Sequence, residues 1–246
     1  MQMSTFEKFN LPKSLQKKAV EWYHLHLLHP GETRLELTLR QHFEFIGLRT
    51  RVVQTCRACN VCRSLKAKHK KYGLLPPKEP ELIPWHTLCI DLIGPYKFGY
   101  KENEVTLHAM TMIDPATGWF EIVEVPNRRA DEISNALEHV WLTRYPWPTE
   151  IVLDRGNEFK REVLAMLKND YGITMKLITT RNPQANSMVE RVHQTIGNMF
   201  RTMQPQHRDL AEENSVEKPW DGILAAIGFA VRTTYHTTTQ ASPAQL

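Results

Sequence analysis

Two stretches decide the fold of this chain: LDRGNEF at residues 153–159 and NPQANSMVER at residues 182–191. An apolar run leads into Asp154, which opens a turn, and Glu190 stands at the start of a helical pattern. The two acids have 35 residues between them.

A third acid, Asp91, lies inside the apolar stretch WHTLCIDLIGP at residues 85–95, which we expect to stop at the Gly-Pro pair. Leaving a lone carboxylate in such a strand is costly unless a positive charge meets it. Two Asp and one Glu that converge would repel one another unless cations lie between them. Mg²⁺ suits such a site, because it prefers hard oxygen ligands and few protein donors.

Each acid also has a structural interpretation. Asp154 could shape its turn, and Glu190 could close a capping box with Ser187. Asp91 could pair with a buried arginine. Two further acids are not assigned to the metal site, since Asp114 belongs to a hairpin turn and Glu158 can serve as a charge at a helix N-terminus. The joint spacing of the first three favours the metal site.

The composition is that of an ordinary globular protein, with 246 residues, 41% hydrophobic and 24% charged, and a net charge of +4. No apolar run approaches the roughly 18 residues of a membrane span, and no signal peptide is visible, so we expect an intracellular protein with no membrane partner. Charge is unevenly distributed, because residues 49–71 contain eight Lys or Arg and no acid. Such a block is either a solvated tether or a segment that follows phosphates.

Hydrophobic periodicity predicts a helical N-terminal domain over 1–72, a proline-rich linker over 73–84 and an α/β core over 85–246. Three hairpin-linked strands followed by alternating helices and strands imply a mixed sheet covered by helices on both faces. The expected strands are 85–93, 106–113, 119–125, 151–153 and 173–178, and the expected helices are 131–144, 159–171 with a C-cap at Gly172, one from Ser187 onwards and one around 220–231.

Metal-binding residue types cluster in the N-terminal segment, where two His and two Cys would suit a closed tetrahedral zinc site. Either overlapping Cys-x-x-Cys pair could supply the thiolates, and two different histidine pairs could reach one metal. The zinc would organise a domain too small to fold on its own core. The fourth cysteine, Cys89, alternates with core residues and is interpreted as packing only. The candidates are His24, His26, His29, Cys56, Cys59 and Cys62.

With these residues in view, the sequence resembles retroelement integrases, most closely those of gypsy-type retrotransposons. Their cores carry two Asp and a Glu with 35 residues between the last pair, matched here by Asp91, Asp154 and Glu190. The neighbouring blocks match as well: Ile93-Gly94-Pro95, then Gly156, Glu158 and Phe159, then Pro183-Gln184-Ala185-Asn186 and Glu190-Arg191. In the zinc domain the resemblance selects His24, His29, Cys59 and Cys62, with Lys66 four residues beyond the last cysteine.

The resemblance implies an RNase H-like catalytic core preceded by a small helical zinc-binding domain. It implies two Mg²⁺ (or Mn²⁺) ions per active site, with Asp91 bridging both, and one structural Zn²⁺. The activity would be a DDE-type polynucleotidyl transferase that trims the 3′ ends of element DNA and joins them to target DNA. Expected contacts to double-stranded DNA are Arg181, Asn182, Gln184, Asn186, Arg191, Lys66 and Lys68.

The same resemblance implies a homo-oligomer that works in the nucleus as part of an integration complex. The family's third, C-terminal DNA-binding domain is not expected within this chain, which stops where the final helix of the core ends. Two alternatives remain: a truncated or host-adopted DNA-binding protein without catalysis, and an RNase H-like nuclease acting on RNA–DNA hybrids. The intact triad weighs against the first, and the zinc module weighs against the second.

Overall fold

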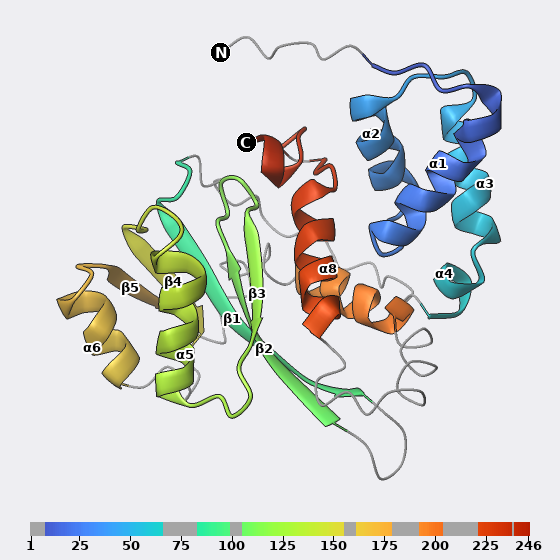
Figure 1. The fold of residues 1–246 in the computed structure, drawn as a ribbon. Helices are drawn as coiled ribbons and strands as arrows, with labels where there is room; N and C mark the ends of the chain where they lie inside the picture. Colours follow the sequence, from blue (N-terminus) through green and yellow to red (C-terminus); the bar gives the residue numbers. More distant parts are fainter. Residues whose placement is uncertain are drawn as a thin grey trace.

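The computed structural model describes residues 8–65, 83–98, 105–154, 161–178, 192–203, 221–237 and 239–246. The N-terminal part consists of four helices around a small apolar centre (Figure 1). Their bounds are α1 Lys13–His26, α2 Glu32–His42, α3 Leu48–Ala58 and α4 Asn60–Leu65. Only six hydrophobic side chains form the buried cluster of this part of the described chain: Val20, Leu35, Leu39, Phe45, Leu48 and Val52.

A five-stranded mixed sheet forms the second part, in the order β3-β2-β1-β4-β5. The central strand β1 pairs antiparallel with β2 and parallel with β4, so the hairpin-linked strands and the parallel strands meet along it. β2 pairs antiparallel with β3, and β4 pairs parallel with β5. The mixed sheet predicted from the sequence is confirmed. The strands are β1 Thr87–Phe98, β2 Val105–Ile113, β3 Phe120–Glu124, β4 Glu150–Asp154 and β5 Thr174–Ile178.

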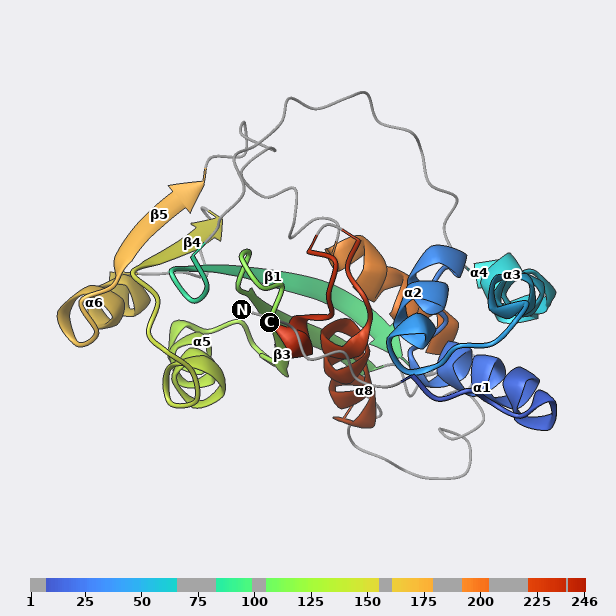
Figure 2. The same cartoon turned by 90° about the horizontal axis from the view of Figure 1, so that it is seen from above.

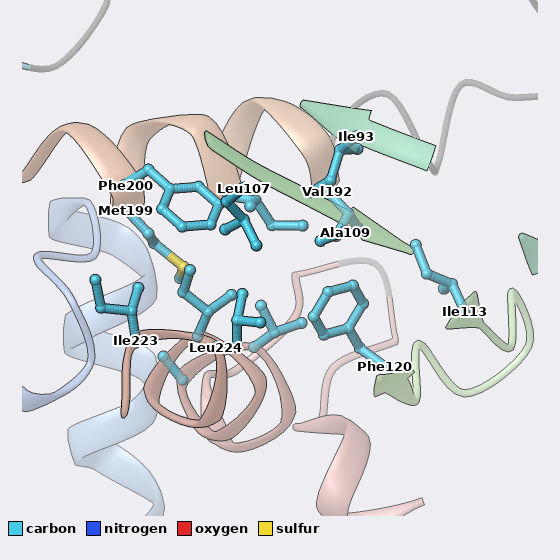
Figure 3. Close-up of a cluster of buried hydrophobic side chains, with 14 of the residues drawn as sticks. Ile93, Leu107, Ala109, Ile113, Phe120, Val192, Met199, Phe200, Ile223 and Leu224 are labelled. Carbon is cyan, nitrogen blue, oxygen red and sulfur yellow. The ribbon is translucent and has the colours of Figure 1, made fainter. Parts of the chain in front are cut away.

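Alternate residues of the strands enter two separate hydrophobic clusters, because successive side chains of a strand point to opposite faces. One face packs against α5 (Ala130–Leu137) and α6 (Arg161–Asn169) through side chains that include Ile90, Met112 and Leu153. The opposite face packs against a helix over 192–203 and α8 (Asp221–Thr233), as Figure 3 shows for Leu107, Phe200 and Leu224. Cys89 is buried in this second cluster, which confirms that it is a packing residue.

The expectation that β1 would stop at Gly94-Pro95 is wrong, because the strand continues to Phe98. Its pairing with β2 shifts register between Ile93 and Tyr96, so the Gly-Pro pair forms an irregularity within the strand rather than its end. Gly94 has φ +105°, and a Cβ there would lie 2.6 Å from the Leu107 carbonyl oxygen. A glycine is therefore required for β2 to approach this closely.

The other predicted elements agree with the structure apart from their ends. The helix expected over 131–144 is α-helical as far as Leu137 and continues as a π-helical turn, η2, over Glu138–Leu142. Gly172, which follows α6, adopts φ +67°, as expected of a residue that ends a helix. A short 3-10 turn, η4 Pro243–Gln245, closes the chain. None of the helices in the described ranges has both the length and the apolar character that crossing a bilayer requires.

The helical module lies against the C-terminal segment rather than apart from the sheet. The Tyr235 backbone N–H donates to Thr38 Oγ1 at 3.0 Å, and Gln41 Nε2 donates to Gln245 Oε1 at 2.7 Å. Leu28, at the end of α1, packs against the cluster of Figure 3. Figures 1 and 2 both place α1–α4 on the far side of α8 from α5 and α6. The α1–α2 connection thus contacts the hydrophobic layer that covers one face of the sheet.

Candidate metal centres

The strand pairing brings two of the three predicted acids to neighbouring positions. Parallel pairing of β1 with β4 sets Ile90 opposite Leu153, and the next residue of each strand is Asp91 and Asp154. Adjacent strands of a sheet lie about 4.8 Å apart. The backbone positions of Asp91 and Asp154 are therefore neighbours near the centre of the sheet, although the two residues are far apart in the sequence.

The Asp91 carboxylate is held by groups from its own backbone and from the covering helix. Its Oδ1 accepts a hydrogen bond from the Leu92 N–H at 2.8 Å, and its Oδ2 lies 3.5 Å from His193 Nδ1. The side chain is 26% exposed. A carboxylate that is fixed in orientation and still reaches solvent can offer its remaining lone pairs to a divalent cation. The described part of this site fits Mg²⁺ in the chemistry of its donor.

His193 contacts the sheet from the helix over 192–203. Its Nε2 lies 2.9 Å from Thr111 Oγ1, and Thr111, which is fully buried, is the residue paired with Asp91 across the β1–β2 ladder. Burial lowers the pKa of His193 to about 4. The imidazole is therefore neutral at pH 7, and its contact with Asp91 is a polar contact rather than an ion pair.

Most of the other predicted DNA and magnesium residues lie outside the described part of the chain. For Asp154 the structure describes the backbone position at the end of β4. Glu190 falls outside the described ranges, as do the predicted DNA contacts Lys66, Lys68, Arg181, Asn182, Gln184, Asn186 and Arg191. These residues stay predictions.

The second candidate centre is assembled from four separate points of the helical module. His24 lies in the last turn of α1, and His29 lies in the connection to α2. Cys59 follows α3 directly, and Cys62 lies in α4. The chain reverses between the two histidines because Leu28 and His29 adopt φ values of 56° and 60°. The His29 N–H then donates to the His24 carbonyl oxygen at 2.8 Å, which brings the two rings together.

The four ligand atoms lie close to the spacing of a tetrahedral zinc site. His24 Nε2 and His29 Nδ1 are 3.0 Å apart. Each nitrogen has a sulfur at 3.3 Å, Cys62 Sγ for His24 and Cys59 Sγ for His29, and all four atoms lie within 4.8 Å of one another. Bond lengths of about 2.0 to 2.3 Å give tetrahedral edges of about 3.3 to 3.8 Å. Both histidines are buried, so the residues fit a structural Zn²⁺.

The structure also places the two residues that the spacing alone left as alternatives. His26 is exposed, and its ring stacks on Trp22 while Nδ1 contacts the Trp22 carbonyl oxygen at 2.9 Å. Cys56 Sγ lies 3.7 Å from His24 Nδ1, the nitrogen that does not face the other ligands. Cys56 thus stands behind a candidate ligand, and the cluster itself contains Cys59 and Cys62.

Comparison with known proteins agrees with this geometry. A family model described as an integrase zinc binding domain matches residues 11–68. Residues 11–68 are therefore similar to an integrase zinc-binding domain. This match and the His2Cys2 cluster together support the structural zinc predicted from the sequence.

Sequence relatives cover nearly the whole chain. The Tf2-3 and Tf2-4 transposon polyproteins of Schizosaccharomyces pombe (strain 972 / ATCC 24843) are each 23% identical over 240 residues. These matches take in 94% of this chain and 17% of each polyprotein, so the chain spans about a sixth of the curated relatives it matches. The predicted resemblance to integrases of gypsy-type retrotransposons is confirmed.

The fold has a solved counterpart in the simian T-cell lymphotropic virus intasome in complex with PP2A regulatory subunit B56 gamma. The likeness has a TM-score of 0.60 at 15% identity and covers 92% of this chain and 71% of that one. At this identity the likeness shows the fold: a helical zinc-binding domain followed by an integrase-type mixed-sheet core, as the sequence predicts.

Sequence reasoning missed two residues of the Asp91 site, Thr111 and His193. Thr111 occupies an inward position on an otherwise apolar face of β2, and His193 stands three residues after Glu190 beside the apolar stripe of its helix. A polar residue at the edge of a core-facing stripe is a weak signal by itself. The contact between them becomes visible only when the helix is docked on the sheet.

Proposed function

We propose that this chain is the integrase region of a retrotransposon, a metal-dependent polynucleotidyl transferase that acts on DNA ends. The observation that carries the proposal is the register of β1 and β4, which sets Asp91 and Asp154 at neighbouring positions of adjacent parallel strands. Glu190, 35 residues beyond Asp154, would supply the third carboxylate. Relatives named as transposon polyproteins support this assignment over an unrelated nuclease.

In the proposed site two Mg²⁺ ions would be held by the carboxylates of Asp91, Asp154 and Glu190. Bound there, the ions would stabilise charge on the attacking and leaving oxygens of an in-line displacement at phosphorus. The chain's own part is to fix the carboxylates, and the Leu92 N–H already orients one oxygen of Asp91. Pre-organised ligands lose little freedom when the ions and DNA arrive.

The two proposed reactions break and form the same kind of bond. In end trimming, a water oxygen attacks the phosphodiester near the 3′ end, a new P–O bond forms, and the 3′-oxygen leaves and takes up a proton. In joining, the freed 3′-hydroxyl of the element attacks a phosphodiester of target DNA, and the target's 3′-oxygen leaves. Each step exchanges one P–O bond for another, so neither requires a covalent protein intermediate or an external energy source.

DNA binding is proposed to involve the basic residues and amides around the third acid, together with the basic stretch that follows the zinc-binding domain. Arginine and lysine would contact phosphates, and such contacts make affinity fall steeply with salt. The match to an intasome supports assembly as a multimer on paired DNA ends. We also propose that the protein acts in the nucleus, where its target DNA lies.

The test is a DNA joining assay on the zinc-loaded chain, with Mg²⁺ and then with EDTA. It includes a branched substrate for the reverse reaction, an RNA–DNA hybrid and a Glu190→Gln variant. Glu158→Gln is the matched control, because it removes a nearby acid that the proposal does not use. Metal-dependent resolution of the branch that is lost in Glu190→Gln and kept in Glu158→Gln is the expected result.

Two outcomes would replace the proposal. If the wild-type chain binds DNA but neither joins nor resolves it at any Mg²⁺ or Mn²⁺ concentration, it is a DNA-binding protein without catalysis. If it cleaves only the RNA strand of the hybrid, it is a nuclease of the RNase H kind. Both outcomes can be read from the same set of gels.

A further inference from the structure

His193 connects three elements that meet at Asp91. The helix over 192–203 supplies the imidazole, β2 supplies Thr111, and β1 supplies Asp91. The ring bridges the other two residues, with Nε2 at 2.9 Å from Thr111 Oγ1 and Nδ1 at 3.5 Å from Asp91 Oδ2. Its side chain is 19% exposed, so few waters can replace these contacts. A ring that is mostly covered and has a polar group beside each nitrogen is constrained in both position and rotation.

The charge on Asp91 decides which nitrogen carries the proton. A neutral imidazole has one N–H, and a carboxylate accepts a hydrogen bond about twice as strong as a neutral oxygen does. Placing the proton on Nδ1 puts it on the nitrogen that lies 3.5 Å from Asp91 Oδ2 and leaves Nε2 to accept the Thr111 hydroxyl hydrogen. The opposite tautomer would aim a nitrogen lone pair at a carboxylate. Thr111 Oγ1 is also 3.1 Å from the Asp91 carbonyl oxygen, so its hydroxyl hydrogen can alternate between the two acceptors.

We propose that His193 is a positioning residue that holds Oδ2 of Asp91, as the Leu92 N–H holds Oδ1, so that the carboxylate faces the two catalytic metal ions in one orientation. This inference rests on the proposed function. With both oxygens contacted from the protein side, the carboxylate keeps one direction in which it would meet the ions. Second-sphere hydrogen bonds of this kind fix the direction of metal ligands and raise metal affinity.

The position of His193 in the chain gives the contact a second consequence. It lies three residues after Glu190, at the start of the helix that covers the acid-bearing face of the sheet. Its neighbours Val192 and Ile196 are buried against that face. One side chain thus links the strand of the first acid to the helix that follows the third. Replacing His193 would therefore change how Asp91 is held without removing an acid.

Three substitutions separate the two nitrogens of the ring. His193→Asn keeps an amide near the position of Nδ1, so it can donate to Asp91, while His193→Gln reaches the position of Nε2 and contacts Thr111 instead. His193→Leu keeps the volume and removes both contacts. His139→Leu is the matched control, because His139 is an exposed histidine in η2. Circular dichroism and the unfolding midpoint verify that each variant is folded.

The first readout is binding of Mn²⁺ to the zinc-loaded chain, followed by electron paramagnetic resonance, with Asp91→Asn to identify the site. His193→Leu and His193→Gln should bind Mn²⁺ about 10-fold more weakly than the wild type. His193→Asn and His139→Leu should bind it as the wild type does. The Mg²⁺ concentration that half-activates branch resolution should shift in the same order. A merely structural role would lower the unfolding midpoint and leave the metal affinity unchanged.

The second readout needs no metal: nitrogen NMR of histidine-labelled protein should show His193 as the Nδ1–H tautomer. An Nε2–H tautomer, or a His193→Leu variant with wild-type Mn²⁺ affinity, overturns the positioning role and leaves the proposed function intact. If His193→Asn binds as weakly as His193→Leu, the ring acts by packing and the inference is again wrong. If the wild-type chain binds no Mn²⁺ that Asp91→Asn abolishes, the proposed function fails and this inference falls with it.

Discussion

A methyl group at position 94 would test how rigidly the strand that carries Asp91 is held against β2. Gly94 has φ +105°, and the added Cβ of Gly94→Ala would lie 2.6 Å from the Leu107 carbonyl oxygen and 3.4 Å from His108 Cα. Both are backbone atoms of β2, which is paired with β1 on either side of the irregularity. Neither atom can withdraw unless part of this ladder opens.

Two other glycines separate the contribution of backbone strain from that of the close contact. Gly172 has φ +67° with nothing within 4 Å of an added Cβ, so Gly172→Ala meets only the backbone strain, about 1–2 kcal/mol. Gly94→Ala adds a close contact, about 1–3 kcal/mol more, and should therefore lower the free energy of unfolding by about 2–5 kcal/mol in total. Gly222 is exposed in α8, with open space and no positive φ, and Gly222→Ala should stabilise the helix by up to about 1 kcal/mol.

Urea unfolding of the zinc-loaded protein, monitored by tryptophan fluorescence, gives the three values on one scale, provided that the slope with denaturant is the same in all variants. Thermal midpoints should follow in the same order, at about 2–4 °C for each kcal/mol in a chain of this size. A Gly94→Ala protein that is no less stable than Gly172→Ala would refute the reasoning. It would mean that β2 yields at Leu107, and that β1 is not clamped beside Asp91.

Three further predictions concern the zinc module and the core. Chelation of zinc, or Cys59→Ser, should unfold α1–α4, because their apolar centre is small. Circular dichroism with metal analysis would show this loss of structure. Cys56→Ser should keep one zinc per chain, and loss of zinc from that variant would contradict the ligand set. Phe200→Ala should cost about 3–5 kcal/mol in denaturant unfolding, because the ring is buried and stacks on Tyr96; a loss under about 1 kcal/mol would show that the core refills the space. Burial, and then the charge of Arg128, lower the pKa of His108. Below about pH 6.5 the unfolded chain therefore binds a proton that the folded chain does not. The free energy of unfolding should decrease as the pH is lowered. His108→Gln should flatten that slope between pH 7 and 5, and an unchanged slope would assign the dependence to other groups.

Much of the sheet was predictable because its signals are local. Alternation of apolar residues marks β2 and β3, and the turn between them is stabilised by Asp114, whose carboxylate accepts hydrogen bonds from the Thr117 hydroxyl and the Ala116 N–H. The end of α6 at Gly172 follows from the left-handed conformation that glycine adopts without strain. The end of β1 was mispredicted, because Gly94-Pro95 reads as a stop although the neighbouring strand accommodates it as an irregularity. The local sequence predicts where an element ends only if no neighbouring strand extends the pairing past that point.

The candidate sites were also predictable only in part from the sequence. Residue types and spacing along the chain predicted a zinc site near the N-terminus, because zinc ligands are recognised by residue type and short spacing. They also predicted that three acids converge, which stays a prediction for Glu190. Spacing could not choose among three histidines and three cysteines, since each lies within reach of several others. Tertiary structure brings His24 and His29 to Cys59 and Cys62, and sets Cys56 behind His24. It alone places the His193 ring between Thr111 and Asp91, because that contact joins residues about a hundred positions apart and exists only once the helix packs on the sheet.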